Sequence, residues 1–213
     1  MPAKAFLVWG AGGHGRVIGD LLRAAGHDLV GFVDADAEAL ASSASPASYL
    51  EEEFMEQLRK RAGYPDGVEA CALGIGDNRL RQSRLQLLEG LDAPALVHPT
   101  AYVSPTASIG RSSVVFPHAV VNPDAWIGDA VIVNSGAIIE HDCRLESGVH
   151  VSPGAVLCGG VSVGERSWVG AGATVIHGVK IGKDAIVGAG STVIRQVADG
   201  ETVIGSPAKA VKG

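Results

Sequence analysis

The chain has 213 residues, enough for one large domain or two small ones with hydrophobic cores. Hydrophobic residues make up 46% of it but aromatic residues only 5%, and glycine occurs 29 times, a composition that favours tightly stacked short strands over a conventional core. The formal net charge of −6 argues against a nucleic-acid-binding protein, and no apolar stretch is long enough to span a membrane. The three widely spaced cysteines argue against disulfides and a thiolate zinc site, so we expect a cytoplasmic protein.

Strands and helices alternate over the first part of the chain. The expected elements are, in chain order, strand 5–9, helix 15–25, strand 29–33, an exposed Ala/Ser-rich loop at 35–48, helix 49–61, strand 70–75 and helix 78–91. This alternation predicts a small α/β domain with a parallel sheet, which we place at residues 1–95.

A glycine motif, Gly10-x-Gly12-x-x-Gly15, joins the first predicted strand to the first helix. With Asp34 at the end of the second strand, it is typical of a dinucleotide site, where backbone N–H groups and a helix N-terminus approach a diphosphate. About ninety residues provide only one mononucleotide-binding half, which favours a nucleotide-sugar site over a nicotinamide site. A purely structural tight turn is the other alternative.

A six-residue repeat begins at Val97. An aliphatic residue occupies every sixth position from there to Val193, a small or β-branched residue lies two positions before it, and glycine often follows it. This period indicates a parallel β-helix in which three units form one triangular coil. We expect the aliphatic residue to point inward and the following glycine to supply tight-turn geometry. The second domain therefore spans residues 96–213.

His141 lies two positions after the inward Ile139, so we expect it at a corner that faces away from the prism, between Glu140 and Asp142. An imidazole at such a corner can remove a proton from an attacking nucleophile at neutral pH, and a carboxylate on its far ring nitrogen fixes the tautomer. A solvated corner histidine without a role is the alternative.

Four segments of the chain carry a resemblance to a known family. They are Gly10-Ala-Gly-Gly-His-Gly15, Ile75-Gly-Asp-Asn-Arg79, Glu140-His-Asp142 and Ile204-Gly-Ser-Pro-Ala-Lys209. In this order the chain resembles the bacterial hexapeptide-repeat sugar O- and N-acetyltransferases related to sialic acid O-acetyltransferase. Within them it is most similar to the nucleotide 4-amino-sugar N-acetyltransferases, which act on UDP-linked 4-amino sugars or on GDP-perosamine. The resemblance implies a left-handed β-helix, a homotrimer, acetyl-CoA as co-substrate without a metal, and a place in lipopolysaccharide O-antigen biosynthesis.

The resemblance also assigns roles in catalysis and substrate binding. It implies His141 as the general base and Asp142 as the carboxylate that orients it, with Glu140 as the alternative orienting residue or a substrate contact. The residues implied for the nucleotide sugar are Gly12, Gly13, His14, Asp34, Asp36, Asp77 and Asn78. His14 can donate to a phosphate or a sugar hydroxyl, or it can be an ordinary residue of the first helical turn.

Acetyl-CoA is expected in a groove between adjacent β-helices. The resemblance places His150 near the thioester carbonyl and lets the Gly159 N–H bind the same oxygen. Ala171 and Ala189 are small corner residues that fit the pantetheine arm, and Lys209 can meet the phosphates or be simply solvated.

We therefore expect acetyl transfer from acetyl-CoA to an amine, at C4, of a nucleotide-linked amino sugar, with GDP-perosamine favoured. The alternatives are a UDP-4-amino-sugar N-acetyltransferase, a sugar O-acetyltransferase and, in another class, a non-catalytic nucleotide-sugar-binding scaffold. An NAD-dependent oxidoreductase is disfavoured because the chain lacks the second mononucleotide-binding half of a dinucleotide-binding domain. A β-helical zinc enzyme similar to carbonic anhydrase needs a closer histidine pair than His141 and His150.

Overall fold

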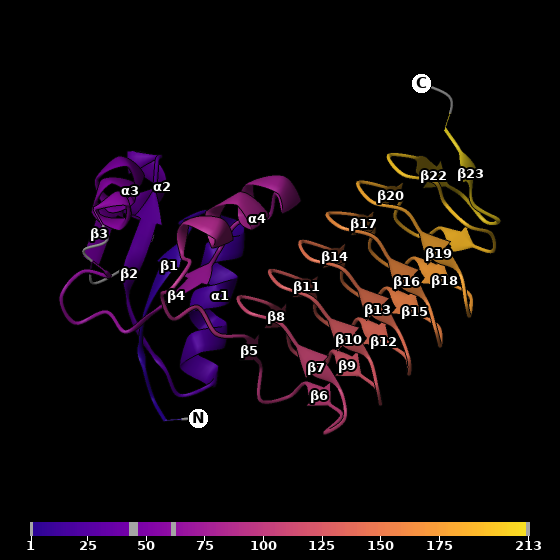
Figure 1. The fold of residues 1–213 in the computed structure, drawn as a ribbon, viewed down its shortest axis with the longest axis horizontal. Helices are drawn as coiled ribbons and strands as arrows, with labels where there is room; N and C mark the ends of the chain where they lie inside the picture. Colours follow the sequence, from indigo (N-terminus) through magenta and orange to yellow (C-terminus); the bar gives the residue numbers. More distant parts are fainter. Residues whose placement is uncertain (1, 43–46, 61–62, 212–213) are drawn as a thin grey trace. The chain divides into compact units, whose positions relative to one another are not determined.

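The computed structural model describes residues 2–42, 47–60 and 63–211, which form two compact units, Met1–Leu96 and Val97–Gly213. The first unit is a layered α/β structure and the second is a stack of short strands (Figure 1). Over these residues, no helix combines the length and the apolar character that a membrane crossing requires.

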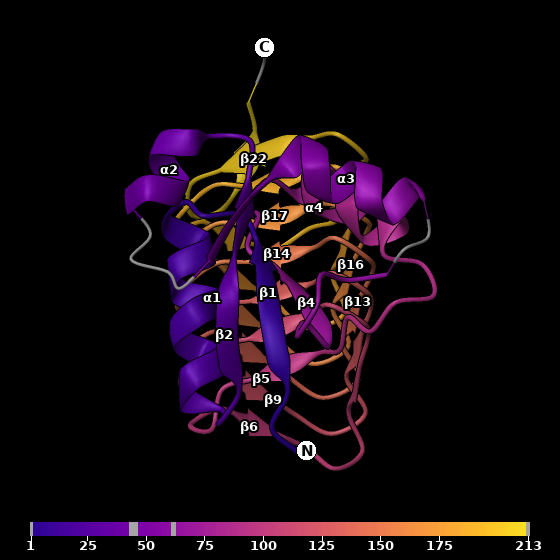
Figure 2. The ribbon, with the colours of Figure 1, turned by 90° about the vertical axis from the view of Figure 1, so that its left-hand side faces the viewer.

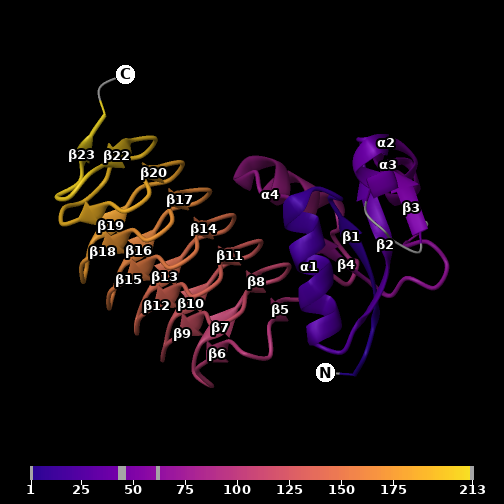
Figure 3. The same ribbon diagram turned by 180° about the vertical axis from the view of Figure 1, so that it is seen from behind.

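The α/β unit is built on a four-stranded parallel sheet with the order β3-β2-β1-β4. Its strands are β1 (Ala5–Trp9), β2 (Asp28–Asp34), β3 (Ala47–Leu50) and β4 (Ala70–Leu73). Its helices are α1 (Gly13–Ala24), α2 (Ala37–Ser42), α3 (Glu51–Arg59) and α4 (Asn78–Leu87). Ile18, Leu21 and Leu22 of α1 are buried, and the helix runs along β1 and β2 (Figure 3). The predicted parallel α/β architecture is confirmed.

The segment expected to be an exposed loop contains secondary structure at both ends. The Asp36 carboxylate accepts hydrogen bonds from the N–H groups of Glu38 and Ala39, at 2.8 and 3.3 Å, and so caps α2. Ala47–Leu50 pairs with β2 as an edge strand, and α3 therefore begins at Glu51 rather than at Tyr49. Sheet pairing overrides the local helical pattern at this point. Residues 43–46 of the expected loop and residue 61 of the expected helix lie outside the described residues.

The second unit is a left-handed parallel β-helix of two-residue strands. These are β5 (Leu96–Val97), β6 (Tyr102–Val103), β7 (Ser108–Ile109), β8 (Val114–Val115), β9 (Val120–Val121), β10 (Trp126–Ile127), β11 (Ile132–Val133), β12 (Ile138–Ile139), β13 (Arg144–Leu145), β14 (His150–Val151), β15 (Val156–Leu157), β16 (Ser162–Val163), β17 (Trp168–Val169), β18 (Thr174–Val175), β19 (Lys180–Ile181), β20 (Ile186–Val187) and β21 (Thr192–Val193). β22 (Thr202–Ile204) continues the stack, and β23 (Lys209–Ala210) pairs with it antiparallel at the C-terminal end. The coils follow one another regularly along the axis (Figure 2).

The strands form the three faces of a triangular prism. The first face contains β5, β8, β11, β14, β17, β20 and β22, the second β6, β9, β12, β15, β18 and β21, and the third β7, β10, β13, β16 and β19. Each strand pairs in register with the strand one coil later, for example Ile138 with Val156 and Ile139 with Leu157. The second residue of a strand points into the core, where Ile139 and Leu157 are fully buried, while the first residue points outward. The predicted repeat is confirmed.

The turns use glycine differently from our expectation. A residue with positive φ recurs at every sixth position from Ser112 to Gly190, and it lies three residues after the inward aliphatic residue. The glycines that directly follow the inward aliphatic residues are needed because the next coil is close. A Cβ on Gly164, for example, would lie 2.5 Å from the Lys183 backbone nitrogen of the next coil. Close approach of the coils, not turn geometry, therefore selects these glycines.

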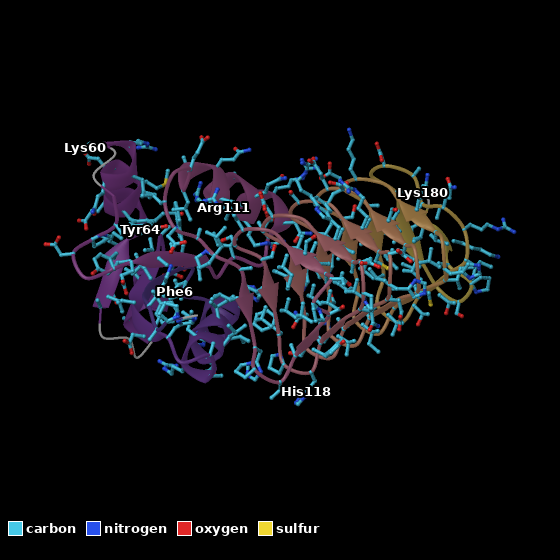
Figure 4. The ribbon with its side chains drawn as sticks, turned by 60° about the horizontal axis from the view of Figure 1, so that its bottom comes forward. Phe6, Lys60, Tyr64, Arg111, His118 and Lys180 are labelled. Atoms are coloured by element: carbon cyan, nitrogen blue, oxygen red, sulfur yellow. The ribbon has the colours of Figure 1, made fainter. Side chains whose placement is uncertain are left out.

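Polar side chains occupy outward positions of the β-helix. His118 in a turn and Lys180 on the third face both point away from the coils (Figure 4). Phe6, in contrast, lies inside the α/β unit, where it is fully buried. A corner position in the β-helix can therefore carry a polar group without any change in the core.

Candidate active site

A pocket of about 360 Å³ lies where β1, β2 and β4 of the α/β unit end. It is lined by Trp9, Gly10, Gly12, Gly13, His14, Val33, Asp34, Ala35, Glu51, Gly74, Ile75, Gly76 and Leu80. The carboxyl ends of parallel strands are the usual ligand position in such sheets. Four of the predicted substrate residues, namely Gly12, Gly13, His14 and Asp34, lie in its lining, whereas Asp36, Asp77 and Asn78 do not.

The glycine loop is held close to the end of β4. Gly10 has a φ of 116°, and a Cβ there would lie 2.5 Å from the Gly74 carbonyl oxygen. A Cβ on Gly15 would overlap the Gly10 carbonyl, so no other residue fits at this position. The Asp34 carboxylate accepts the Ala11 N–H at 2.7 Å and fixes the loop from the other side. The loop thus leaves Gly12 and the first turn of α1 at the pocket, where a helix N-terminus favours an anion.

The three predicted residues outside the lining have local bonds. Asp36 caps α2, and the Asp77 carboxylate accepts the Leu80 N–H at 2.7 Å as the cap of α4. The Asn78 side-chain oxygen accepts a hydrogen bond of 2.8 Å from Arg81. In this structure these side chains therefore shape the loops beside the pocket.

Arg81 is a part of this site that the sequence did not reveal. It is only 1% exposed, and one of its terminal nitrogens donates to the carbonyl oxygens of Ile75 and Gly76, both at 3.1 Å. Burial lowers its pKa to about 10, against the opposing charge of Asp77, so it stays charged at neutral pH. Because both acceptors line the pocket, Arg81 fixes the shape of that wall. An arginine in a predicted surface helix gives no signal of such a role.

His14 enters the pocket lining from the first turn of α1. Burial and, to a smaller extent, the positive charge of Arg81 together lower the pKa of this imidazole to about 4. His14 is therefore neutral at pH 7 and offers one N–H donor and one acceptor.

Glu51 is a second group that sequence patterns did not single out. One of its carboxylate oxygens accepts hydrogen bonds from the Trp9 indole N–H at 2.8 Å and from Arg84 at 2.9 Å. This shared oxygen ties the start of α3 to β1 and α4 at the pocket wall. The pattern of charges in a predicted amphipathic helix does not distinguish such a carboxylate from a solvated one.

His141 stands at the corner of the β-helix between the second and third faces, as the repeat predicts, with 62% of its side chain exposed. Its Nδ1 lies 2.7 Å from an Asp142 carboxylate oxygen. Asp142 has a φ of 59°, and aspartate tolerates this left-handed conformation better than most residues. The hydrogen bond to Asp142 raises the pKa of His141, and the charges of Asp142 and Glu140 act in the same direction.

Gly159 occupies the same corner one coil later. A Cβ there would lie 2.6 Å from His141 Nε2, so the imidazole edge rests directly on this glycine. Among the residues that the structure describes, no acceptor pairs with the Gly159 N–H. The corner therefore combines an oriented imidazole with an adjacent backbone donor, which is the set of groups that acyl transfer requires. His177 lies at this corner one further coil along and is exposed.

The other predicted acetyl-CoA residues, His150, Ala171, Ala189 and Lys209, lie elsewhere on the β-helix. His150 is on the first face, with Nε2 at 3.1 Å from the Asn134 side-chain nitrogen. Ala171 and Ala189 are exposed, one coil apart, at the corner between the first and second faces. Lys209 is exposed on β23. One copy of the β-helix thus brings His141, Asp142 and Gly159 together and keeps the other residues apart from them.

Neither a nucleophilic Cys143 nor a metal site is supported by the described residues. The Cys143 thiol is buried, and burial raises its pKa to about 11, so it is not a nucleophile at neutral pH. Within residues 2–42, 47–60 and 63–211, no group of three His, Cys, Asp or Glu side chains converges in a way that could hold a metal ion.

Comparison with known proteins gives matches to both units. The family model described as the PglD N-terminal domain matches residues 5–88, and the model described as bacterial transferase hexapeptide (six repeats) matches residues 160–195. No curated protein sequence matches the chain.

Solved structures match over nearly the whole chain. PerB from Caulobacter crescentus, in complex with CoA and GDP-perosamine, is 39% identical, with a TM-score of 0.88 over 98% of this chain and 97% of that one. The acetyltransferase domain of PglB from Neisseria gonorrhoeae, in complex with acetyl coenzyme A, is 35% identical, with a TM-score of 0.86 over 98% of this chain and all of that one. WeeI from Acinetobacter baumannii is 25% identical, with a TM-score of 0.81 over 97% of this chain and 99% of that one.

Proposed function

We propose a reaction and a substrate for this chain, which belongs to the hexapeptide-repeat sugar N-acetyltransferases that carry a PglD-type N-terminal domain. It is an acetyl-CoA-dependent enzyme, and the proposed acceptor is the C4 amine of a GDP-linked 4-amino sugar such as GDP-perosamine. The similarity to the Caulobacter crescentus enzyme supports the choice of GDP. A cytoplasmic location and a role in lipopolysaccharide O-antigen biosynthesis are part of the same proposal.

The observation that carries the proposed mechanism is the His141 corner. Because the Asp142 carboxylate accepts a hydrogen bond from Nδ1–H, the lone pair of the neutral imidazole is on Nε2, the nitrogen beside Gly159. His141 Nε2 takes the proton from the sugar amine as its nitrogen attacks the thioester carbon. The Gly159 N–H stabilises the oxygen that becomes negative. The C–S bond then breaks, and the imidazolium can protonate the departing thiolate.

The positions of the acetyl-CoA residues support a homotrimer. In a triangular prism the first face, with His150, is opposite the corner that carries His141, so these residues can meet only across two copies of the chain. The outward residues of the second face, between the His141 corner and the Ala171 corner, include Tyr102, Val120, Ile138 and Val156. Such an apolar strip suits packing between copies. We infer that His141 and Gly159 of one copy and His150, Ala171 and Ala189 of the next form one site.

Mixed assemblies test this shared site. His141→Asn and Ala171→Trp should each inactivate the homo-oligomer, the first by removing the base and the second by filling the groove. Co-expressed together, they should regain activity, because some sites then receive His141 from one copy and Ala171 from the other. A site contained in one copy would give no recovery, and light scattering on the purified enzyme gives its oligomeric state.

The nucleotide part of the substrate is proposed to bind in the pocket of the α/β unit. Gly12, Gly13 and the N-terminus of α1 suit a diphosphate, and neutral His14 can donate to a phosphate or hydroxyl oxygen. Asp34 in the pocket lining, and Asp36, Asp77 and Asn78 in the loops beside it, stay proposed substrate-binding residues, and Glu140 is proposed to assist at the His141 corner. Lys209 remains a proposed contact for the CoA phosphates.

Thiol release from acetyl-CoA tests the whole assignment. A panel of GDP- and UDP-linked 4-amino sugars, with a matched 4-hydroxy sugar nucleotide, should give release with a GDP-linked amine and an N-acetylated product by mass spectrometry. Preference for UDP or for the hydroxyl sugar would replace the proposed acceptor. Binding of a nucleotide sugar without any release would support the scaffold alternative and end the assignment of His141.

A further inference from the structure

Four side chains from three successive coils form one cluster on the first face of the β-helix. Asn134 follows β11, His150 belongs to β14, Ser152 follows β14 and Trp168 belongs to β17. The strand register places His150 directly opposite Trp168. Their rings lie 5.8 Å apart between centroids, with only 9° between their planes, which is a stacked arrangement.

The hydrogen bonds of Asn134 define which nitrogen of His150 carries the proton. The Asn134 side-chain oxygen accepts the Ser135 N–H at 2.8 Å, so the NH₂ group is the part that faces the imidazole. That NH₂ group lies 3.1 Å from His150 Nε2, which must therefore accept. In the neutral ring the proton is then on Nδ1, and Nδ1–H is the only donor that His150 can offer.

Trp168 is anchored although it lies at the surface. Its indole N–H donates to the Ser152 hydroxyl at 2.6 Å, and Ser152 is only 4% exposed. The Trp168 side chain itself is 48% exposed, so it contributes little to the core. A large aromatic ring that is half in solvent, bonded to a buried hydroxyl and parallel to an imidazole is suited to holding that imidazole in one plane.

We propose that Trp168 is a positioning residue that fixes the ring of His150 for its work at the thioester. This inference rests on the proposed function, in which His150 of one copy meets the acyl group beside His141 of the next. Asn134 sets the tautomer and Trp168 sets the plane, so that a single N–H donor is presented in a single direction. A donor aimed before the reaction stabilises the developing oxyanion without reorganisation.

Steady-state kinetics of Trp168→Ala and Trp168→Phe test the inference. Trp168→Ala should lower kcat about tenfold, since one preorganised donor is misaligned, with the KM for the nucleotide sugar changed less than about twofold. Trp168→Phe keeps a ring over the imidazole and should recover at least about half of the loss on a logarithmic scale. Trp126→Ala is the matched control, because Trp126 is an outward tryptophan of the third face that packs on Arg144, 4.0 Å from its ring centroid, and it should leave kcat unchanged.

An NMR measurement separates this inference from the proposed function. The ring protons of His150, assigned with His150→Gln, should be shielded by the indole in the wild type, shift downfield in Trp168→Ala and return part of the way in Trp168→Phe. Unchanged His150 resonances in Trp168→Ala would overturn the inference even if no substrate were known. Full kcat in Trp168→Ala, with kcat lost in His150→Gln, would overturn it while leaving the proposed function intact. If the wild type releases no thiol, the proposed function fails, and the resonances alone decide whether Trp168 holds the ring.

Discussion

The α/β unit and the β-helix hold their functional groups in opposite ways. In the β-helix, His141 and Asp142 are both more than half exposed at a corner, and the core beneath them is made of aliphatic residues and Cys143. In the α/β unit, the wall of the pocket is fixed by Arg81, which is buried, and His14 is partly buried near it. A change at the corner should therefore alter chemistry without altering stability, whereas a change at the pocket should alter both.

The largest effect is expected from Arg81→Met. The substitution removes the hydrogen bonds that the buried Arg81 guanidinium donates to Ile75, Gly76 and Asn78, and hydrogen bonds of a charged group contribute roughly 1.5–3 kcal/mol each. We expect a loss of about 4 kcal/mol in the unfolding free energy of the α/β unit and loss of nucleotide binding. Amide hydrogen exchange measures the loss of stability separately for the α/β unit and for the β-helix. Equal loss of protection in the β-helix would contradict the separation of the two units.

The pH dependence of stability should reveal His14. Its pKa is about 4 in the folded protein and near 6.5 when unfolded, so the unfolded chain takes up the proton first as the pH falls. The free energy of unfolding is therefore unaffected by the protonation of His14 above pH 6.5. It falls between pH 6.5 and 4, by up to roughly 3 kcal/mol. Urea unfolding of wild type and His14→Gln across this range measures the difference. If the two proteins lose stability in parallel, the pKa of His14 is not lowered in the folded protein.

Gly159→Ala should affect activity with little effect on stability. The added methyl group would lie 2.6 Å from His141 Nε2, and the exposed ring can swing away, so the fold is kept while the base is displaced. We expect a fall in kcat of about a hundredfold, the size of a general-base contribution, with a melting temperature within about 2 °C of wild type. In the control, Gly164→Ala, the methyl group meets backbone atoms of the next coil, and here the melting temperature should fall. The reverse pattern in the two variants would refute this account of the corner.

The smallest expected effect is that of Asp142→Asn. Because the hydrogen bond to Asp142 is the main reason that the pKa of His141 is raised, the substitution should lower this pKa. The acid limb of the pH–rate profile should move to lower pH, and the plateau should fall about tenfold as the imidazole becomes less basic and its tautomer is no longer fixed. Glu140→Gln should move the limb less, because its contribution is the smallest of those that raise the pKa. A larger shift for Glu140→Gln would make Glu140 the orienting carboxylate.

The same difference explains what the sequence could predict. In a repeat of six residues the environment of each side chain follows from its position, so the inward Ile139, the exposed corner of His141 and its neighbour Gly159 could all be placed by counting. The same count places His150, nine residues or half a coil after His141, on the opposite face, but the repeat does not encode the neighbouring copy that is proposed to bring the two histidines together. In the α/β unit, the roles of Arg81 and Glu51 depend on contacts between helices and strand ends that are far apart in the chain, and no local pattern encodes them. The edge strand Ala47–Leu50 was missed because sheet pairing, not propensity, decides its structure.

One pair of variants distinguishes a catalytic base at His141 from an exposed corner histidine without a role. His141→Asn and His177→Asn change two exposed histidines of the same corner, and only the first has a carboxylate partner at 2.7 Å. With saturating acetyl-CoA and the accepted sugar nucleotide, we predict that His141→Asn lowers the rate of thiol release at least about a hundredfold, while His177→Asn stays within about twofold of wild type. A rate for His141→Asn within tenfold of wild type, with the oligomeric state unchanged and the sugar nucleotide bound, would mean that His141 is not the base.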